Sequence, residues 1–260
     1  MLKQLFLVVA LLVSNAALVA SDEPLRLRVL SYNIHHGQGV DGMLDLQRIA
    51  DVILSVKPDL VALQEVDQNT KRTGGVDQAA KLAELTKMKV VFGANIDLQG
   101  GHYGNAVLSR LPIESHHNVL LPNLDSGEQR GVIQAELKLP AADQALLLLA
   151  THFDHRRDSR ERVQSAEKVN AIVAKLQDKP ALLAGDLNAT PDSQTLKVLQ
   201  QQWTIANQQP LATVPVQQPS KQIDFILFRP AQRWSVVDVT VLDEAVASDH
   251  RAILAVLELK

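Results

Sequence analysis

The pattern of apolar and polar positions predicts a fold with many strands and few long helices. Residues 25–31 alternate apolar and basic side chains, as in a strand with one buried face. Residues 44–56 carry apolar side chains at helical spacing, and residues 59–64 form an apolar strand that leads to Glu65. A strand, a helix and a second strand in this order are typical of a layered α/β fold.

The later segments continue this mixture of elements. Helices are predicted at residues 77–86 and 159–176, and a loop rich in Pro and Gln is predicted at residues 208–220. Further strands are predicted at residues 89–93, 106–109, 114–121, 131–139, 145–151, 181–185, 222–228, 234–242 and 251–259. We therefore expect two packed sheets flanked by helices.

Residues 1–20 are typical of a secretory signal peptide. Lys3 gives a positive start, residues 5–13 form an apolar run, and small residues up to Ala20 precede a polar segment. An uncleaved anchor is the alternative, but a spanning helix needs about 20 predominantly apolar residues. We therefore expect export to a bacterial periplasm or secretion, with no transmembrane segment in the mature chain.

Residues 21–260 are expected to form one domain, because no linker, charge block or repeat divides them. The chain has no cysteine, which excludes disulfides, thiolate metal sites and a cysteine nucleophile. Its formal net charge of −3 gives no general attraction to nucleic acid. This charge weakens the case for a nuclease without excluding one.

Several polar residues stand where a predicted apolar strand ends. Asn33 and Glu65 are two of them, although Asn33 could form a turn and Glu65 could be a solvated turn acid. Asp186 and Asn188 place two oxygen groups on one side of an extended segment, and Gly185 permits close approach of the backbone. The structural alternative for this pair is a turn cap.

Two histidines occupy comparable positions. His152 follows an apolar strand and lies beside several arginines. Asp158 and Arg162 have i,i+4 spacing, so most of these arginines are interpreted as a solvated, paired helix face. Asp249 and His250 join a ligand for hard metals to a group that titrates near neutrality.

Carboxylate, amide and imidazole groups of this kind suit the hydrolysis of a phosphate ester. The reaction builds negative charge on oxygen, which a divalent cation and hydrogen-bond donors stabilise. Oxygen ligands favour Mg²⁺ or Mn²⁺, whereas a dedicated zinc site uses more His or Cys. A histidine can accept the proton of the attacking water.

Seven short motifs occur in a specific order along the chain. They are Tyr32-Asn33-Ile34, Leu63-Gln64-Glu65-Val66, residues 104–110 (GNAVLSR), Thr151-His152, Gly185-Asp186-Leu187-Asn188, Ile223-Asp224-Phe225 and Ser248-Asp249-His250. They resemble the motifs of the endonuclease/exonuclease/phosphatase superfamily of metal-dependent phosphohydrolases, from about residue 25 to the C-terminus. The resemblance implies a four-layer α/β/β/α sandwich with its site at one end of the paired sheets.

The resemblance also implies roles for the metal ligands and for one histidine. Glu65 corresponds to the principal Mg²⁺ ligand, assisted by Asn33 and Asp249. His250 corresponds to the general base or to a phosphate ligand, and Asp224 to the carboxylate that orients it.

Three further catalytic residues follow from the same resemblance. Asp186 corresponds to the residue that positions or activates the water, Asn188 to a ligand of a phosphoryl oxygen, and His152 to a donor to the phosphate. The motifs leave open whether Asp186 or His250 is the general base.

Other positions resemble small bacterial members that are described as metal-dependent hydrolases. Arg72 and Arg130 are candidates for contacts with the substrate phosphate, because a guanidinium group matches phosphate geometry, although both could be surface residues. Asn105 and His35 are further candidates for such contacts. His36 is expected at the rim of the pocket.

The predicted function is that of an exported Mg²⁺- or Mn²⁺-dependent phosphoesterase, in particular a phosphodiesterase, that uses direct attack by water. The substrate is a phosphate ester of a small molecule, a lipid headgroup or a nucleic acid, and no protein partner is implied. Only 3% of the residues are aromatic, which weakens the case for base stacking and hence for a nonspecific endonuclease. The alternative outside the enzymes is an inactive binding module with the same fold.

Overall fold

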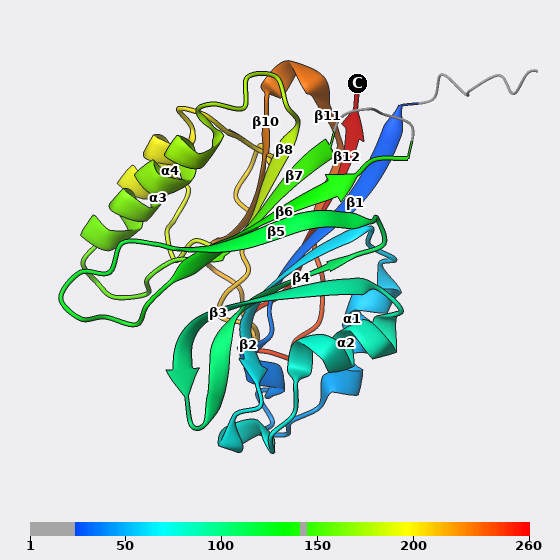
Figure 1. Ribbon diagram of the computed structural model, residues 1–260, viewed down its shortest axis with the longest axis vertical. Coiled ribbons are helices and arrows are strands. Elements are labelled where there is room, and N and C mark those ends of the chain that lie inside the picture. The colour runs from blue at the N-terminus through cyan, green and yellow to red at the C-terminus, as the bar shows by residue number, and fades with distance from the viewer. Residues whose placement is uncertain (1–23, 141–144) are drawn as a thin grey trace, which may run out of the picture.

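The computed structural model describes residues 24–140 and 145–260 and contains two six-stranded sheets that pack face to face (Figure 1). The first sheet consists of β1 (Leu25–Asn33), β2 (Leu60–Gln68), β3 (Lys89–Leu98), β4 (Gly101–Ser109), β11 (Trp234–Val241) and β12 (Ile253–Leu259). The second consists of β5 (Ile113–Leu120), β6 (Gly131–Lys138), β7 (Ala145–His152), β8 (Ala181–Asp186), β9 (Thr204–Ile205) and β10 (Asp224–Arg229). Their orders are β11-β12-β1-β2-β4-β3 and β5-β6-β7-β8-β10-β9.

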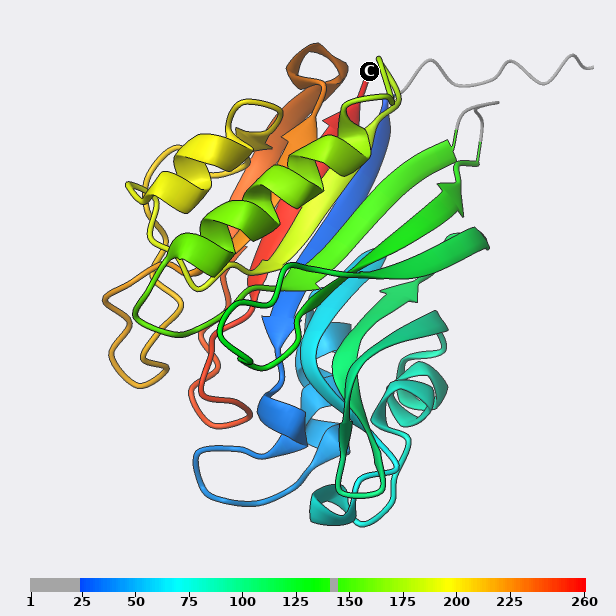
Figure 2. The same cartoon turned by 60° about the vertical axis from the view of Figure 1, so that its left-hand side comes forward.

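Helices cover the outer face of each sheet. The helices are α1 (Leu46–Ser55), α2 (Gln78–Thr86), α3 (Arg160–Val173) and α4 (Gln194–Leu199). The first two lie against the first sheet, and α3 and α4 lie against the second (Figures 1 and 2). Three apolar clusters fill the spaces between layers, one between the sheets and one beneath each helical layer. The predicted four-layer α/β/β/α sandwich is therefore confirmed.

Aspartate caps determine where the first two helices begin. The side chain of Asp45 accepts a hydrogen bond from the backbone N–H of Arg48 at 3.0 Å, so α1 begins at Leu46. The helix predicted from residue 44 therefore starts too early, and Leu44 is 47% exposed instead of buried. Asp77 caps α2 in the same way, by accepting from the N–H of Ala80.

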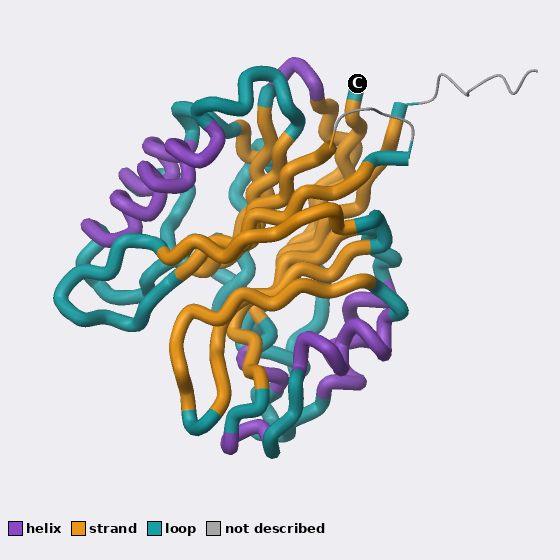
Figure 3. Tube along the Cα trace, viewed as in Figure 1, coloured by secondary structure: helices purple, strands orange, loops and turns teal. Residues whose placement is uncertain are grey.

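The structure also differs from the prediction in the length of two strands and in two short elements. Strands β3 and β4 are longer than expected and form a hairpin, because Gln99 and Gly100 both have positive φ and close a tight turn. The sequence pattern did not predict α4 or β9. Figure 3 shows the resulting balance, in which strands dominate, the α-helices form the outer layers and short 3-10 turns lie at the ends of the sandwich.

The sheet topology gathers the polar strand ends at one end of the sandwich. Strands β1 and β2 are parallel, as are β7 and β8, so each pair ends at the same edge. Strand β10 is antiparallel to β8, which places its first residue, Asp224, opposite Asp186. Strand β12 is antiparallel to β1, so the segment before it, which contains Asp249 and His250, meets the end of β1.

Gly185 allows this end of the second sheet to pack closely. A Cβ atom on Gly185 would lie 2.0 Å from the carbonyl oxygen of Thr151 on β7. Only glycine fits there, as the sequence suggested, and Asp186 follows directly.

The predicted signal segment, residues 1–20, lies outside the described residues. Within residues 24–140 and 145–260, no helix is long and apolar enough to cross a membrane.

Candidate functional site

A bulge in β2 turns Glu65 into the end of the sandwich. The pairing of β2 with β4 shifts register between Leu63 and Val66, and Glu65 has φ of 60°. Such bulges redirect a side chain out of the regular alternation of a strand. Left-handed backbone is uncommon for residues other than glycine, and it recurs at Asn188, where φ is 47°. Strained backbone of this kind often accompanies functional sites.

Asn33, the last residue of β1, connects the two halves of the site. Its Nδ2 donates to Glu65 Oε1 at 3.0 Å and to Asp186 Oδ2 at 3.2 Å. Its Oδ1 accepts from the backbone N–H of His35 at 3.1 Å. Because that N–H can only donate, the orientation of the amide is fixed. Asn33 thus joins a carboxylate of the first sheet to one of the second.

Asp224, His250 and Asp186 form a buried cluster. His250 Nδ1 lies 2.9 Å from Asp224 Oδ2, and His250 Nε2 lies 3.7 Å from Asp186 Oδ2. Burial disfavours the charged imidazole, but the carboxylates of Asp224, Asp186 and Asp249 outweigh it and raise the pKa of His250 to about 10. The predicted orientation of His250 by Asp224 is present in this geometry.

Asp186 lies at the centre of this cluster. Its Oδ1 accepts from the backbone N–H of Asn188 at 2.8 Å, and its Oδ2 lies 3.5 Å from His152 Nε2. Burial and the neighbouring carboxylate of Asp224 raise the pKa of Asp186 to about 7. Such a carboxyl group can exchange a proton near neutral pH.

Arg130 selects the tautomer of His152. A nitrogen of the Arg130 guanidinium lies 3.0 Å from His152 Nδ1. Because a guanidinium group can only donate, Nδ1 must be the acceptor and the proton of the neutral ring lies on Nε2. Burial and the charge of Arg130 lower the pKa of His152 well below its usual value. His152 therefore presents a neutral N–H donor toward Asp186.

Asn188 lies beside this donor. Its side-chain amide lies 3.1 Å from the carbonyl oxygen of Phe153 and 3.1 Å from His152 Nε2. The structure thus brings together all five predicted catalytic residues, namely His152, Asp186, Asn188, Asp224 and His250.

A hollow of about 370 Å³ opens beside this cluster and contains most of the other predicted residues. Its lining includes His35, His36, Glu65, Arg72, Ile96, Leu98, Tyr103, Glu128, Arg130, His155 and Asp249. Asp249 is exposed there, and His36 is part of the lining, as expected for a residue at a pocket rim. Burial and the nearby charge of Arg72 lower the pKa of His36 to about 4.

Each arginine of the hollow already has a carboxylate partner. Arg72 donates from Nε and Nη2 to the two oxygens of the buried Asp67, both at 2.7 Å, and its guanidinium lies 5.4 Å from the ring centre of Tyr103. Arg130 is 3% exposed and forms an ion pair with Glu128 at 2.8 Å. Arg130 is therefore not the surface residue considered as an alternative from the sequence, whereas Arg72 is exposed but is held by Asp67.

Asn105 occupies a different position from the other candidates. It is buried between the sheets, where its Nδ2 donates to the carbonyl oxygen of Gly131 at 3.0 Å. Its Oδ1 has no hydrogen-bond partner among the described residues. The contact of Asn105 with a substrate phosphate stays a prediction.

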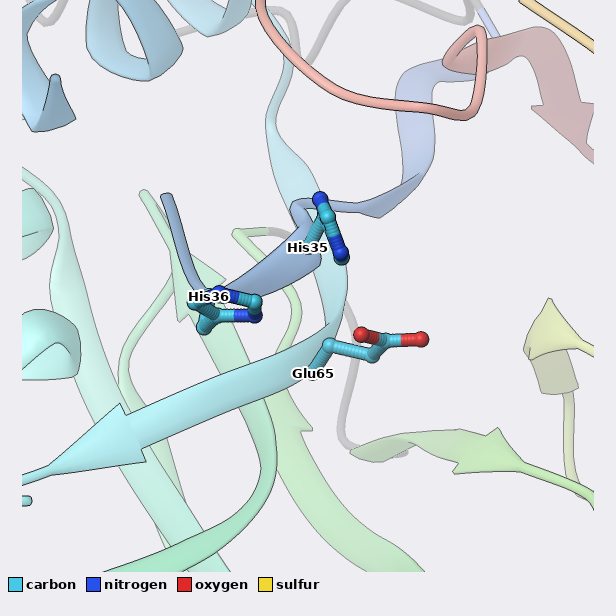
Figure 4. Close-up of side chains that lie close together, drawn as sticks. All are labelled: His35, His36 and Glu65. Carbon is cyan, nitrogen blue, oxygen red and sulfur yellow. The ribbon is translucent and has the colours of Figure 1, made fainter. Parts of the chain in front are cut away.

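The donors of the hollow fit a divalent cation. The carboxylates of Glu65 and Asp249 line it, and no ion pair involves either of them in the described part of the chain. One potential ligand atom from each of His35, His36 and Glu65 lies within 4.8 Å of the other two (Figure 4). A second group with this spacing consists of Asp186, Asp224 and His250.

The sequence pattern did not single out several residues of the hollow. Tyr103, Glu128 and His155 line it, and Asp67 holds Arg72. Two of them had a local signal, since Asp67 follows Glu65 by two residues and Glu128 precedes Arg130 by two. Tyr103 and His155 had none beyond their proximity to motif residues.

The predicted pairing of Asp158 with Arg162 is wrong. Arg162 is buried and donates to the carbonyl oxygens of Asp154 and Arg156. Asp158 instead accepts from Arg160. Arg162 thus stabilises the loop that follows His152, and it does not form part of a solvated helix face.

Comparisons with known proteins show what this chain is similar to. Residues 30–250 match the model of the Endonuclease/Exonuclease/phosphatase family. The chain is 29% identical over 247 residues to the uncharacterized protein YbhP of Escherichia coli K12, covering 89% of this chain and 96% of YbhP.

Solved structures share the fold. An endonuclease/exonuclease/phosphatase from Beutenbergia cavernae is 26% identical, with a TM-score of 0.76, covering 90% of this chain and 72% of that one. A mannosyl-6-phosphatase from Bacteroides thetaiotaomicron is 19% identical, with a TM-score of 0.72, covering 89% and 99% of the two chains.

Proposed function

Because the chain belongs to the Endonuclease/Exonuclease/phosphatase family, we propose that it hydrolyses phosphodiesters with the help of Mg²⁺ or Mn²⁺. Members of this family are generally hydrolases of phosphate esters. The observation that carries the proposal is the junction at Asn33, whose amide joins Glu65 to the buried cluster around Asp186. This contact between Glu65 and Asp186 through Asn33 supports a metal ion held at Glu65 close to the buried cluster.

Glu65 and Asp249 are the residues that would hold the ion, and Asn33 holds the Glu65 carboxylate in place through its Nδ2. When bound, a divalent cation supplies positive charge to phosphoryl oxygens and to a developing leaving group. Oxygen donors of this kind suit Mg²⁺ and Mn²⁺.

Asp186 is the residue that accepts the proton of the attacking water. Its Oδ2 lies between the Nε2 atoms of His152 and His250, at 3.5 and 3.7 Å. Its raised pKa, about 7, suits a general base near neutral pH. Asp224 holds the ring of His250 through Nδ1, which leaves the Nε2 side of that ring to donate to a phosphoryl oxygen.

His152 and Asn188 complete the set of donors. The Arg130 guanidinium keeps the proton of the neutral His152 ring on Nε2. His152 can therefore donate a hydrogen bond to a phosphoryl oxygen while it stays neutral. The side-chain amide of Asn188 lies next to it and can donate to the same phosphoryl group. The protein holds these donors in place before the substrate binds. Donors that are already oriented stabilise the charge of a transition state without further rearrangement.

The charges in the hollow favour a phosphodiester over a phosphomonoester. A monoester carries up to two negative charges near neutral pH, whereas a diester carries one. Arg72 and Arg130 are paired with Asp67 and Glu128, so the hollow offers little unpaired positive charge. A singly charged phosphate group therefore fits this surface better.

A substrate panel tests the proposal. The purified protein with Mg²⁺ or Mn²⁺ is expected to cleave bis(p-nitrophenyl) phosphate faster than p-nitrophenyl phosphate. Plasmid DNA, RNA, sphingomyelin, phosphatidylinositides and sugar phosphates then identify the natural class of ester. The matched control is Asp186→Asn, which keeps the shape of the side chain and is expected to be inactive.

Two results would change this assignment. Nicking of plasmid DNA faster than cleavage of any small diester would make the protein a nonspecific endonuclease. No cleavage of any ester above the level of the Asp186→Asn protein would make it a binding module of the same fold.

A further inference from the structure

We propose that His35, His36 and Glu65 form a site for a divalent transition metal, so that the ion held at Glu65 has two nitrogen ligands. The inference rests on the proposed function in that Glu65 is the metal-holding carboxylate, and it names the metal class as Mn²⁺, Co²⁺ or Zn²⁺ in preference to Mg²⁺. Figure 4 shows both imidazole rings beside the Glu65 carboxylate, and one potential ligand atom of each lies within 4.8 Å of the others. Neighbouring ligand atoms at about 2.1 Å from an ion lie about 3 Å apart. The three ligand atoms would therefore move closer together when they bind the ion.

His35 has one ring nitrogen ready to bind a metal. Its Nδ1 lies 3.1 Å from the carbonyl oxygen of Gln38. A carbonyl oxygen can only accept, so the proton lies on Nδ1 and the lone pair on Nε2. Histidines that bind metals commonly donate their other N–H to a backbone carbonyl in this way.

His36 offers a second nitrogen in the same space. Its Nδ1 is buried and has no hydrogen-bond partner among the residues that the structure describes. A buried polar atom of this kind is rare without a partner, and a metal ion would provide one. The rings of His35 and His36 are 4.5 Å apart at an angle of 64°, so their edges can face one ion from two sides.

The backbone holds the three ligands in an unusual conformation. The φ angles of His35, His36 and Glu65 are 46°, 44° and 60°, all in the left-handed region that side chains other than those of Asn and Asp rarely adopt. The 3-10 turn η1 (His35–Gly37) is fixed on two sides, by the bond from Gln78 Nε2 to the carbonyl oxygen of His36 and by that from the N–H of Asp45 to Gly37. Strained backbone that the surrounding structure maintains at each proposed ligand is typical of a functional site.

The unpaired carboxylates of the hollow also favour a cation at this position. Glu65 and Asp249 line the hollow without forming an ion pair among the described residues, whereas Arg72 and Arg130 are paired with other carboxylates. Two imidazoles and a carboxylate are a ligand set that first-row transition metals accept, whereas Mg²⁺ prefers oxygen. The geometry therefore favours a transition metal at Glu65.

Metal binding by histidine variants tests the inference. Chelator-treated wild-type protein and the His35→Asn/His36→Asn double variant are titrated calorimetrically with Co²⁺ and with Mg²⁺. Asn tolerates left-handed backbone and replaces a ring nitrogen by an amide oxygen. The wild type is expected to bind Co²⁺ more tightly than Mg²⁺, and the double variant to bind Co²⁺ roughly 100-fold more weakly, with a much smaller change for Mg²⁺.

A spectroscopic measurement detects the nitrogen ligands directly. Pulsed electron paramagnetic resonance of Mn²⁺ bound to the wild type is expected to show coupling to imidazole nitrogen, which the double variant lacks. His102→Asn is the matched control, because His102 is exposed on β4 and contacts Asp97 outside the hollow. Circular dichroism and thermal melting verify that each variant is folded.

The results separate this inference from the proposed function. Equal Co²⁺ affinity of the wild type and the double variant, or no nitrogen coupling in the wild type, would overturn the histidine site even if diesters are cleaved with Mg²⁺. Nitrogen coupling that the wild type shows and the double variant lacks supports the site even if no phosphate ester is cleaved, whereas coupling that the double variant retains would assign the nitrogen to another histidine and overturn it.

Discussion

Replacing Glu65 by glutamine is expected to lower the turnover of a phosphodiester by roughly 1,000-fold or more, because it removes the charge that holds the divalent cation. The substitution keeps the size of the side chain. In the wild type Asn33 donates to Glu65 Oε1, and the amide oxygen of glutamine can accept the same hydrogen bond. The measurement is the initial rate with bis(p-nitrophenyl) phosphate at saturating Mg²⁺ or Mn²⁺.

The matched control for Glu65 is Glu114→Gln. Glu114 is an exposed residue of β5 on the opposite sheet, so its substitution is expected to leave the rate unchanged. Wild-type turnover by the Glu65→Gln protein would show that the metal and the chemistry lie elsewhere.

Replacing His250 by glutamine is expected to lower turnover by roughly 100- to 10,000-fold, the range typical of a positioned proton donor or acceptor. Glutamine retains a donor that can reach Asp224, but it loses the charge that the environment of His250 favours. The rate is compared with that of His117→Gln, which alters an exposed histidine of β5.

The His250→Gln protein also has an expected stability profile. The neighbouring carboxylates raise the pKa of His250 from 6.5 to about 10, so protonation stabilises the folded state. This contribution is complete below pH 6.5 and is lost as the pH rises through about 10. The stability difference between wild type and variant in urea unfolding should therefore shrink over this range. An unchanged rate, or a stability difference that grows with pH, would contradict the assigned environment of His250.

The strand ends of the site could be predicted from the sequence because their signals are local. His152 and Asp186 follow the largely apolar residues 145–151 and 181–185, Asn33 follows a segment of alternating apolar and basic residues, and each of the three is the last residue of a strand in the structure. The four-layer fold was predicted from the order of the motifs, because no local pattern shows that β1 and β8 belong to different sheets.

Other contacts depend on backbone geometry that composition does not reveal. The approach of His35 and His36 to Glu65 requires left-handed backbone at all three residues, and only the neighbouring Gly37 hints at such a turn. Arg130 resembles a surface residue in sequence, yet it is buried and controls the tautomer of His152. The helix α4 escaped prediction because it has only six residues, too few to show a clear period.

Removal of divalent cations tests the central claim most directly. After dialysis against excess EDTA, the protein is expected to lose its phosphodiesterase activity, and addition of Mg²⁺ or Mn²⁺ is expected to restore it. Full activity in the continued presence of excess EDTA would contradict a metal-dependent reaction at Glu65.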